Sequence, residues 1–579
     1  MIELKYSKIL QENKKLGNNL TSSSYAVRVS SNIIVHQIKE ILEYLLRAEG
    51  INANVAFGDY DNIVQDSQRY KDANTVIIFW ELCNIIDGLQ YKIELLNDDE
   101  RDKILEKIKT EINLVLKNLE KASLGLINKF TSLAFSYSSR RKNWLDELAS
   151  QLNNYLEENI PSSVKLVDLE KVIANVGVSN SLDLRYYYSS KALYTIDFFK
   201  FYAEYVKPFI MSANGKAKKA LIFDCDNTLW KGILGEDGFD NIEMSASTKD
   251  GAIFAEIQSM TLSLNGQGIL IGLCSKNNPG DVDEVLASHP DMQLRNEHIT
   301  INKSNWSNKV TNLKKIAKEL NIGLDSLVFV DDSSFEVNLI KEHQPEVTVL
   351  QVPKRLYKYP NMLRENLGHF YNLSFTSEDR KKIEMYKQQV KRETVKKEFT
   401  DIEDYLSSLD LKMTIFENEK SIIPRMSQMS QKTNQFNLTT KRYTESDIRK
   451  FIDNPNSDVY AFSLADKLGD SGVTGLSIVT TNGSTGTAEI DTLLVSCRVI
   501  GRKIEYAFLD YVLRKTKEIG IDEIKAKYIT TRKNEQVKEF YDKYSFELIN
   551  ESDTLRNYTL DLSQYDANRI DYIEVVNGK

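Results

Sequence analysis

The sequence predicts an α/β protein of several domains, with a parallel sheet near its centre. The chain has 579 residues, more than one hydrophobic core organises, so we expect about three or four domains. Short apolar runs in the middle of the chain each end in polar residues and are separated by stretches of helical periodicity: ALIFDCD, GILIGLCSK and SLVFVDD. This pattern is typical of buried parallel strands that alternate with helices.

Composition and charge narrow the functional classes. The residues are 41% hydrophobic and 27% charged, and the formal net charge of −8 argues against nucleic acid as the main partner. The opening segment lacks the apolar centre of a signal peptide, and no run reaches the ~18 apolar residues of a membrane span. The cysteines lie apart without metal-binding spacing, which predicts free thiols in a cytoplasmic protein: Cys83, Cys225, Cys274 and Cys497.

Residues 1–211 are expected to form the first domain, an α/β unit. Apolar residues at helical spacing predict a helix over 32–50, and NANVAFGDY and TVIIFWEL then read as strands. Amphipathic patterns predict further helices around 102–122 and 140–158. Alternation of strand and helix favours an α/β domain.

The second domain is predicted over 212–375, beginning with the polar link SANGKAKK. The charged stretch over 378–399 predicts a solvated helix inside a linker, 376–408. The third domain, 409–579, has an α+β pattern, in which AFSLAD, GVTGLSIVTT and TAEIDTLLVS read as antiparallel strands. A helix over 501–520 and a strand at EIKAKYI are expected to follow.

Carboxylates and other polar side chains follow the apolar runs of the middle domain. Side chains alternate along an extended segment, so Asp224 and Asp226 share one side and Cys225 faces the other. A DxD motif alone is usually a turn or a helix cap. Here the second run supplies a hydroxyl, WSNKV supplies an amine, and the third run ends in two carboxylates: Ser275, Lys309, Asp331 and Asp332. The carboxyl ends of parallel strands share one crevice, and carboxylates approach a phosphate only with cations present, so the set predicts phosphoryl chemistry with Mg²⁺.

These motifs resemble those of the haloacid dehalogenase (HAD) superfamily. Four longer segments are similar to those of the FkbH-like branch, also called HAD class IIIC: DCDNTLWKGILGEDG, LCSKNN, HPDMQLR and LDSLVFVDD. TNQFNLTTKRY resembles the C-terminal part of that family, so the resemblance covers about residues 25–560. It implies a HAD-like Rossmannoid sheet, preceded by an SGNH-like domain and followed by a GNAT-like domain.

The resemblance also implies roles for the polar residues. Asp224 would be the nucleophile that accepts the phosphoryl group and Asp226 the general acid and base. Thr228 and Ser275 would bind phosphate oxygens, and Lys309 would offset charge. Mg²⁺ would be held by Asp224, the main-chain carbonyl of Asp226 and Asp331, with Asp332 orienting that shell. TLWKGILGEDGF fits the flap hairpin beside a HAD site.

The spacing of the motifs bears on the size of the substrate. Between Asp226 and Ser275, and between Ser275 and Lys309, there is room for a strand and one or two helices. A large cap domain does not fit there, so we expect an open site that admits a carrier protein, unless a neighbouring domain acts as the lid.

Cys274 is the predicted acyl-carrying thiol, and an inert packed thiol is the alternative. It directly precedes Ser275, and a cation with Lys309 nearby would lower its pKa from about 8.5. FkbH-like proteins take a glyceryl group from 1,3-bisphosphoglycerate, remove its phosphate and deliver the glyceryl group to the pantetheine thiol of an acyl carrier protein. The resemblance makes the cysteine of CSKN the candidate for the intermediate thioester.

The outer domains carry weaker signals. VRVSSN places Ser30 and Ser31 where the serine nucleophile of an SGNH hydrolase would lie. The catalytic triad of that family also needs a histidine late in the domain, and no histidine occurs between His36 and His289. We therefore expect a domain without catalytic function. Arg498 and Gly501 resemble the GNAT signature, whose main-chain amides bind a pyrophosphate, but Lys503 departs from it. Asn534 and Tyr541 match the later Asn and Tyr positions of the GNAT family. These residues, with Lys441–Tyr443, are candidate pantetheine contacts; an ordinary helix start, a core tyrosine and surface residues are the alternatives.

The leading hypothesis is a Mg²⁺-dependent phosphatase and glyceryl transferase that loads an acyl carrier protein in polyketide-type or polysaccharide biosynthesis. A simple phosphomonoesterase acting on a sugar or acyl phosphate is the first alternative. A non-catalytic scaffold that recruits a carrier protein is the second.

Overall fold

The computed structural model describes residues 3–20, 23–70, 72–120, 122–135, 143–373, 377–482, 486–531, 533–567 and 569–578. Two compact units, Met1–Ala213 and Asn214–Lys579, make up the chain. The expected helix start at residue 140 and the expected domain boundary at 375–376 lie outside the described residues. Among the described helices, none is long and apolar enough to cross a membrane.

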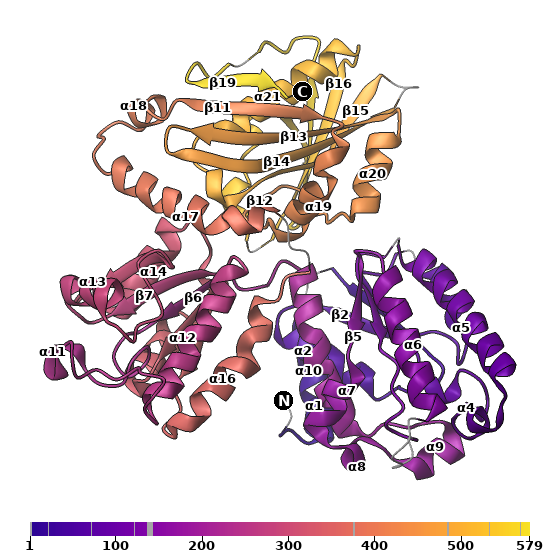
Figure 1. Cartoon of the computed structure of the whole chain (residues 1–579). Helices are drawn as coiled ribbons and strands as arrows, with labels where there is room; N and C mark the ends of the chain where they lie inside the picture. The colour runs from indigo at the N-terminus through magenta and orange to yellow at the C-terminus, as the bar shows by residue number, and fades with distance from the viewer. Residues whose placement is uncertain are drawn as a thin grey trace. The chain divides into compact units, whose positions relative to one another are not determined.

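The first unit is built on a parallel sheet of five strands in the order β2-β1-β3-β4-β5 (Figure 1). Its strands are β1 (Tyr25–Ser31), β2 (Ala53–Phe57), β3 (Thr75–Phe79), β4 (Gly125–Asn128) and β5 (Val164–Val167). Its α-helices are α1 (Tyr6–Asn19), α2 (Ile38–Ala48), α3 (Ile63–Arg69), α4 (Leu89–Lys92), α5 (Asp98–Leu119), α6 (Trp144–Asn159), α7 (Leu169–Val176), α8 (Val178–Ser181), α9 (Leu184–Ser190) and α10 (Ile196–Ala213).

The helices of this unit begin and end where local chemistry dictates. A capping box fixes the start of α5, since Asn97 and Glu100 exchange side-chain and main-chain hydrogen bonds. The predicted helix over 32–50 is shorter in the structure, because residues 32–37 form a connection whose apolar side chains, Ile33 and Val35, are buried.

The second unit contains another five-stranded parallel sheet, in the order β10-β9-β6-β7-β8. Its strands are β6 (Ala220–Phe223), β7 (Leu270–Ser275), β8 (Ile299–Ser304), β9 (Leu327–Asp331) and β10 (Thr348–Gln351). The three predicted strands are β6, β7 and β9. All three are fully buried, as their continuous apolar runs require.

Helices cover both faces of this sheet. Alternate residues of β6 face two separate cores. Leu221 and Phe223 pack with α12 (Gly251–Gly266), α13 (Pro279–Ser288) and α16 (Tyr359–Asn366), whereas Ala220 and Ile222 pack with α14 (Lys309–Glu319) and α15 (Ser334–His343). Only α11 (Leu234–Asp237) and α12 separate β6 from β7, and only α13 separates β7 from β8. The expectation of a sheet without a large cap is therefore confirmed.

The C-terminal part forms a third, mainly antiparallel sheet, in the order β17-β18-β16-β15-β14-β13-β11-β19, with β12 paired to β15. Its strands are β11 (Leu411–Glu417), β12 (Phe436–Asn437), β13 (Ser457–Asp466), β14 (Gly469–Asn482), β15 (Thr487–Val495), β16 (Glu523–Ile529), β17 (Glu547–Glu551), β18 (Leu555–Asp561) and β19 (Ile573–Asn577). Helices α17 (Ser377–Lys396), α18 (Ile402–Ser407), α19 (Ile423–Lys432), α20 (Glu445–Asp453) and α21 (Ile504–Glu518) accompany it. The predicted strands of this part and its central helix agree with β13–β16 and α21.

Candidate active site

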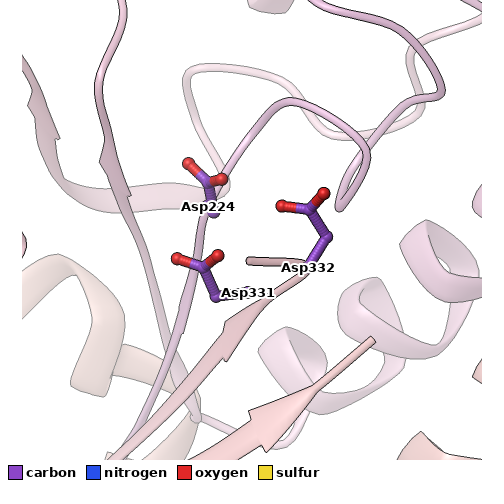
Figure 2. Close-up of side chains that lie close together, drawn as sticks. All are labelled: Asp224, Asp331 and Asp332. Carbon is purple, nitrogen blue, oxygen red and sulfur yellow. The ribbon is translucent and has the colours of Figure 1, made fainter. Parts of the chain in front are cut away.

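Three carboxylates meet at the carboxyl edge of the middle sheet. Asp224 directly follows β6. Asp331 is the last residue of the adjacent β9, and Asp332 directly follows it. The main-chain amide of Asp224 donates to Val330 O at 2.9 Å, which fixes the two strand ends side by side. One oxygen from each of the three carboxylates lies within 4.8 Å of the others, and Figure 2 shows the side chains grouped around one space.

Lys309 supplies the positive charge of this cluster. It is the first residue of α14, and its Nζ lies 2.7 Å from Asp331 Oδ2 and 3.1 Å from Asp224 Oδ2. Both carboxylates and the amine are buried. Asp224, Lys309 and Asp331 therefore lie together, as the sequence predicts.

The pKa values of the cluster follow from burial and crowding. Burial raises the pKa of Asp224 despite the opposing effect of Lys309. Burial and the neighbouring Asp224 raise the pKa of Asp331 to about 6, and the same two causes raise the pKa of Asp332. Burial acts to lower the pKa of Lys309, but Asp224 and Asp331 outweigh it and raise that pKa, so the amine stays charged.

Asp226 lies beside the cluster and is held differently. Its Oδ1 accepts hydrogen bonds from Trp230 Nε1 and from the main-chain amide of Leu234, each at 3.0 Å. Its Oδ2 accepts one from Asn277 Nδ2, also at 3.0 Å. Three donors on two elements fix the orientation of this carboxylate, which suits a residue that must hand over a proton at one place.

Asn277 and Trp230 are residues that the motif analysis missed. Asn277 also donates to Ser275 Oγ at 3.1 Å, so one amide ties the predicted general acid to a predicted phosphate ligand. A signal was present: both residues lie within the motifs LCSKNN and DCDNTLW, close to residues already singled out.

Thr228 is the first residue of the flap segment, two residues after Asp226. Its side chain is fully buried, and its Oγ1 has no hydrogen-bond partner among the described residues. Tyr359 OH donates to its carbonyl at 3.0 Å. A buried hydroxyl with an unused hydrogen bond fits the predicted role as a donor to a phosphate oxygen.

The flap differs from the expected hairpin. A single antiparallel bridge between Lys231 and Glu243 closes it, and α11 lies inside it. Gly232 and Gly238 take φ values of 102° and 78°, which are accessible to glycine and interrupt an extended ladder.

Cys274 does not match its prediction. The thiol is fully buried in the core that contains Ile222 and Leu313, and its nearest polar partner is the carbonyl of Lys309 at 3.9 Å. Burial raises the pKa of this thiol, although Lys309 opposes the change. The expectation of a thiol that reaches the crevice with a lowered pKa is therefore wrong, because Cys274 lies on the face of β7 opposite to Ser275. Cys225 is also fully buried, in the other core.

Two of the predicted pantetheine contacts of the C-terminal part, Asn534 and Tyr541, are buried. Asn534 is fully buried, and its amide donates to the carbonyls of Asn437 and Ile529 at 2.9 Å, which fastens β12 beside β16. Tyr541 is buried among Phe540, Phe546 and Tyr558.

The loop that precedes α21 is likewise engaged. Arg498 is buried, Gly501 has a φ of 87°, and the next residue, Arg502, binds Asp466 at 3.1 Å. Arg392 of α17 binds the same Asp466 at 2.8 Å. Lys503 pairs with Glu403 at 2.8 Å. The side chains of the Lys441–Tyr443 segment also form hydrogen bonds within the protein. Lys441 and Tyr443 both bind Asp491. Arg442 donates to the carbonyls of Ser430 and Gln431.

At the corresponding edge of the first unit, the two serines make only internal contacts. Ser30 is fully buried, with its Oγ 3.5 Å from Asp66 Oδ2, and Ser31 Oγ donates to Ile33 O at 2.7 Å. The ring of His36 packs against Phe57 at 4.8 Å. No histidine–serine pair forms within the described part of this unit.

Comparison with known proteins supplies likenesses of fold. No model of a known protein family matches the chain, and no curated protein matches it in sequence. The chain is similar to the N-terminal part of the protein BF1531 from Bacteroides fragilis, which contains a phosphatase domain and was crystallised in complex with Mg. That likeness has 24% identity and a TM-score of 0.55, and it covers 64% of this chain and 100% of that one. It confirms the α/β fold class.

Smaller likenesses involve the C-terminal part. One is to the ribosomal-protein-S18-alanine N-acetyltransferase from Escherichia coli, with 12% identity and a TM-score of 0.22, covering 27% of this chain and 99% of that one. Another is to an N-acetyltransferase from Staphylococcus aureus, with 15% identity and a TM-score of 0.21, covering 26% of this chain and 98% of that one.

Proposed function

We propose that this protein is a Mg²⁺-dependent phosphatase of the HAD type, in which Asp224 is the nucleophile. The observation that carries the proposal is the position of Lys309, whose amine lies within 3.1 Å of Asp224 and 2.7 Å of Asp331. A purely structural ion pair would need one carboxylate for one amine. Here two buried carboxylates, Asp224 and Asp331, share one lysine, and the partly exposed Asp332 lies beside them, which leaves an excess of negative charge that a divalent cation would neutralise.

The donor set suits magnesium. Mg²⁺ prefers hard oxygen ligands, and one or two carboxylates together with substrate phosphate are its usual partners. Asp224 and Asp331, with the main-chain carbonyl of Asp226, would hold it, and Asp332 lies close enough to orient that shell or join it. When bound, the ion supplies charge neutralisation for the phosphate oxygens. The similar Bacteroides fragilis protein was crystallised with the same ion.

The residues then divide the reaction between them. A carboxylate oxygen of Asp224 attacks phosphorus, and the bond from phosphorus to the leaving oxygen breaks. Asp226, held by Trp230, Leu234 and Asn277, gives its proton to that leaving oxygen. Asp226 afterwards takes a proton from water, which attacks the phosphoaspartate and releases inorganic phosphate. Thr228 and Ser275 donate hydrogen bonds to the phosphoryl oxygens, and Lys309 stabilises their charge.

For the substrate, we propose a phosphoglyceryl group derived from 1,3-bisphosphoglycerate, delivered as a glyceryl group to the thiol of an acyl carrier protein in the cytoplasm. The long motifs shared with FkbH-like proteins support this choice. The absence of a cap insertion supports it too, because short connections between β6, β7 and β8 leave room for a macromolecular substrate.

The buried Cys274 changes the route that we propose for acyl transfer. The thiolate of the carrier's pantetheine attacks the acyl carbon of the acyl phosphate, the bond from that carbon to the phosphate oxygen breaks, and inorganic phosphate leaves. A thioester on the carrier results without a protein-bound intermediate. The remaining phosphomonoester is then removed at Asp224. No step is assigned to the C-terminal part, where Asn534, one of the predicted pantetheine contacts, is buried and bonded to main-chain carbonyls.

Two alternatives have observations in their favour. A simple phosphomonoesterase acting on a sugar or acyl phosphate needs only the Asp224 cluster, and the burial of Cys274 favours it over a thioester route through that residue. A non-catalytic scaffold would fit the internal bonding of both outer domains, but it gives no reason for the buried charge cluster of the middle sheet.

The test separates these possibilities by product. The protein is incubated with Mg²⁺, 1,3-bisphosphoglycerate and an acyl carrier protein, and phosphate release and the intact mass of the carrier are measured. A glyceryl-sized gain on the carrier that survives Cys274→Ala and is lost in Asp224→Asn supports the proposed route. Phosphate release without a gain in carrier mass leaves the phosphomonoesterase. No phosphate release from any phosphoester, with or without Mg²⁺, leaves the scaffold.

A further inference from the structure

The exposed side of α14 carries a stripe of lysines that the phosphatase chemistry does not use. Lys314, Lys315 and Lys318 are exposed, whereas Val310, Leu313 and Ile316 on the opposite side are buried in the core. The spacing of the lysines places them on one face of the helix. Among the residues that the structure describes, these three lysines form no ion pair.

The same helix is tied directly to the reacting groups. α14 begins with Lys309, whose amine binds Asp224 and Asp331. From Lys309 to Lys318 the helix rises about 14 Å. A partner seated on the lysine face would therefore lie within the length of a short flexible arm from the carboxylate cluster.

An exposed aromatic side chain stands at the site end of this helix. Trp306, three residues before Lys309, is 71% exposed. Its indole N–H donates to Asn278 Oδ1 at 3.1 Å, and the neighbouring Asn277 donates to Asp226. The ring is thus anchored to the loop that holds the predicted general acid while its surface stays open. Exposed tryptophans of this kind are over-represented among the residues that dominate binding energy at protein interfaces.

The charge of α14 contrasts with that of the chain. The formal net charge of the protein is −8. The one acidic residue of α14, Glu319, is already engaged by Lys303 at 2.7 Å and by Lys397 at 3.5 Å. The positive charge of the exposed face is therefore local and uncompensated, and it selects for an acidic partner. Nucleic acid is disfavoured as that partner, because an overall acidic chain repels a long phosphate backbone.

We propose that the exposed face of α14, consisting of Lys314, Lys315, Lys318 and the preceding Trp306, is a docking surface for an acidic protein domain that carries the phosphorylated group into the crevice. This inference rests on the proposed function, since it names the part of the molecule that would receive the carrier. The lysines steer and orient the acidic domain, and Trp306 provides an apolar contact beside the mouth of the site.

Binding, rather than turnover, is the readout that tests the docking surface independently of the chemistry. A fluorescently labelled acidic acyl carrier protein is titrated with the full-length protein at 50 mM salt, and the fluorescence anisotropy is measured. We expect the dissociation constant to rise at least tenfold in Lys314→Glu/Lys315→Glu and severalfold in Trp306→Ala. The effect of the charge reversals should shrink at 500 mM salt, because surface charges are then screened.

A matched control reverses the same number of charges elsewhere. Lys14 of α1 and Lys117 of α5 are also exposed helical lysines, and Lys14→Glu/Lys117→Glu should leave the dissociation constant within about twofold of the unchanged protein. Equal losses in both double variants would mean that overall charge, and not this face, attracts the carrier, and would overturn the proposal. Failure of the unchanged protein to bind the carrier would also overturn it.

A failure of the proposed function looks different in the same experiment. If that function is wrong and the docking surface is right, the carrier binds with the expected dependence on α14, yet no phosphate is released from a phosphoglyceryl thioester on its pantetheine arm. If only the docking surface is wrong, the thioester on the carrier is dephosphorylated equally by the unchanged protein and by Lys314→Glu/Lys315→Glu.

Discussion

The first and the middle sheet are built alike and differ at the edge where ligands of such sheets bind. Each has five parallel strands, and in each the central strands end in polar residues. In the middle sheet these residues are charged and crowded, and one lysine pairs with two of three neighbouring carboxylates. In the first sheet Asn32, Glu81 and Asn84 bond to their neighbours.

Several polar residues at the carboxyl edge of the first sheet bond to one another. Asn32, after β1, exchanges two hydrogen bonds with the main chain of Glu81, after β3. Asn84 binds the carbonyl of Asn32, and the Glu81 carboxyl accepts a hydrogen bond from Tyr194 at 2.7 Å. The two sheets therefore differ in how far the fold balances the polar groups at their strand ends.

The largest expected effect comes from removing the single cation of the middle cluster. Lys309→Met leaves Asp224 and Asp331 facing each other and the substrate phosphate without a fixed positive charge. We expect phosphate release from p-nitrophenyl phosphate with Mg²⁺ to fall by about 10³-fold or more. Ser31→Ala at the matching edge of the first sheet should change it less than about twofold.

Folding must be checked in the same variants, because a buried carboxylate that loses its partner destabilises a protein by about 3–5 kcal/mol. Thermal unfolding identifies that case. A folded Lys309→Met protein that retains full activity would falsify the assignment of this cluster as the reacting site. A large loss in Ser31→Ala would erase the contrast between the two sheets.

A smaller effect is expected from the buried carboxyl of the first sheet. Burial raises the pKa of Glu81 to about 7, and the hydrogen bond from Tyr194 opposes only part of this change. The pKa of a glutamate side chain in the unfolded chain is about 4.3. Between these values the folded state holds a proton that the unfolded state has lost, so the free energy of unfolding falls as pH rises through this window, by on the order of 3 kcal/mol.

Glu81→Gln should remove that dependence, since the amide cannot ionise and its oxygen can still accept from Tyr194. Urea unfolding followed by hydrogen-exchange mass spectrometry of peptides from β3 reports on this unit at pH 5 and pH 8. The exposed Glu106→Gln serves as the control and should keep the pH dependence of the unchanged protein. If Glu81→Gln keeps it as well, the carboxyl is ionised in the fold and the first sheet is less self-contained than its hydrogen bonds indicate.

Local pattern was enough to predict much of this architecture. Continuous apolar runs predict β6, β7 and β9. Because parallel strands share one carboxyl edge, the sequence alone groups Asp224, Lys309 and Asp331. The orientation of Cys274 follows from the same local pattern. Side chains alternate along an extended segment, so Cys274 faces away from Ser275 just as Cys225 faces away from Asp224.

Other features depend on contacts that no local pattern encodes. The GNAT-like signature correctly marked the start of α21, but the pairing of Arg502 and Arg392 with Asp466 joins residues from three distant segments. The insertion of β12 beside β15 and the capture of its Asn437 by Asn534 are likewise long-range. Burial of Asn534 therefore emerges only from the assembled sheet.

The smallest of the expected effects concerns Asn277, which connects two functional side chains without touching the carboxylate cluster. Asn277→Ala removes one of the three donors to Asp226 and the bond to Ser275, while Trp230 and Leu234 still hold the other oxygen of Asp226. We expect a fall in kcat of about tenfold with little change in KM, because proton transfer depends on the orientation of Asp226 and binding of the phosphate depends chiefly on other groups.

Asn338→Ala on the exposed side of α15 is the matched control and should behave as the unchanged protein. A rise in KM with constant kcat would instead mean that Asn277 acts through Ser275 on phosphate binding. The comparison of the two sheets adds a reason for expecting the first result. Asn32 and Asn84 use the same amide chemistry to close the edge of the first sheet, whereas Asn277 uses it to hold a carboxylate that stays available for reaction.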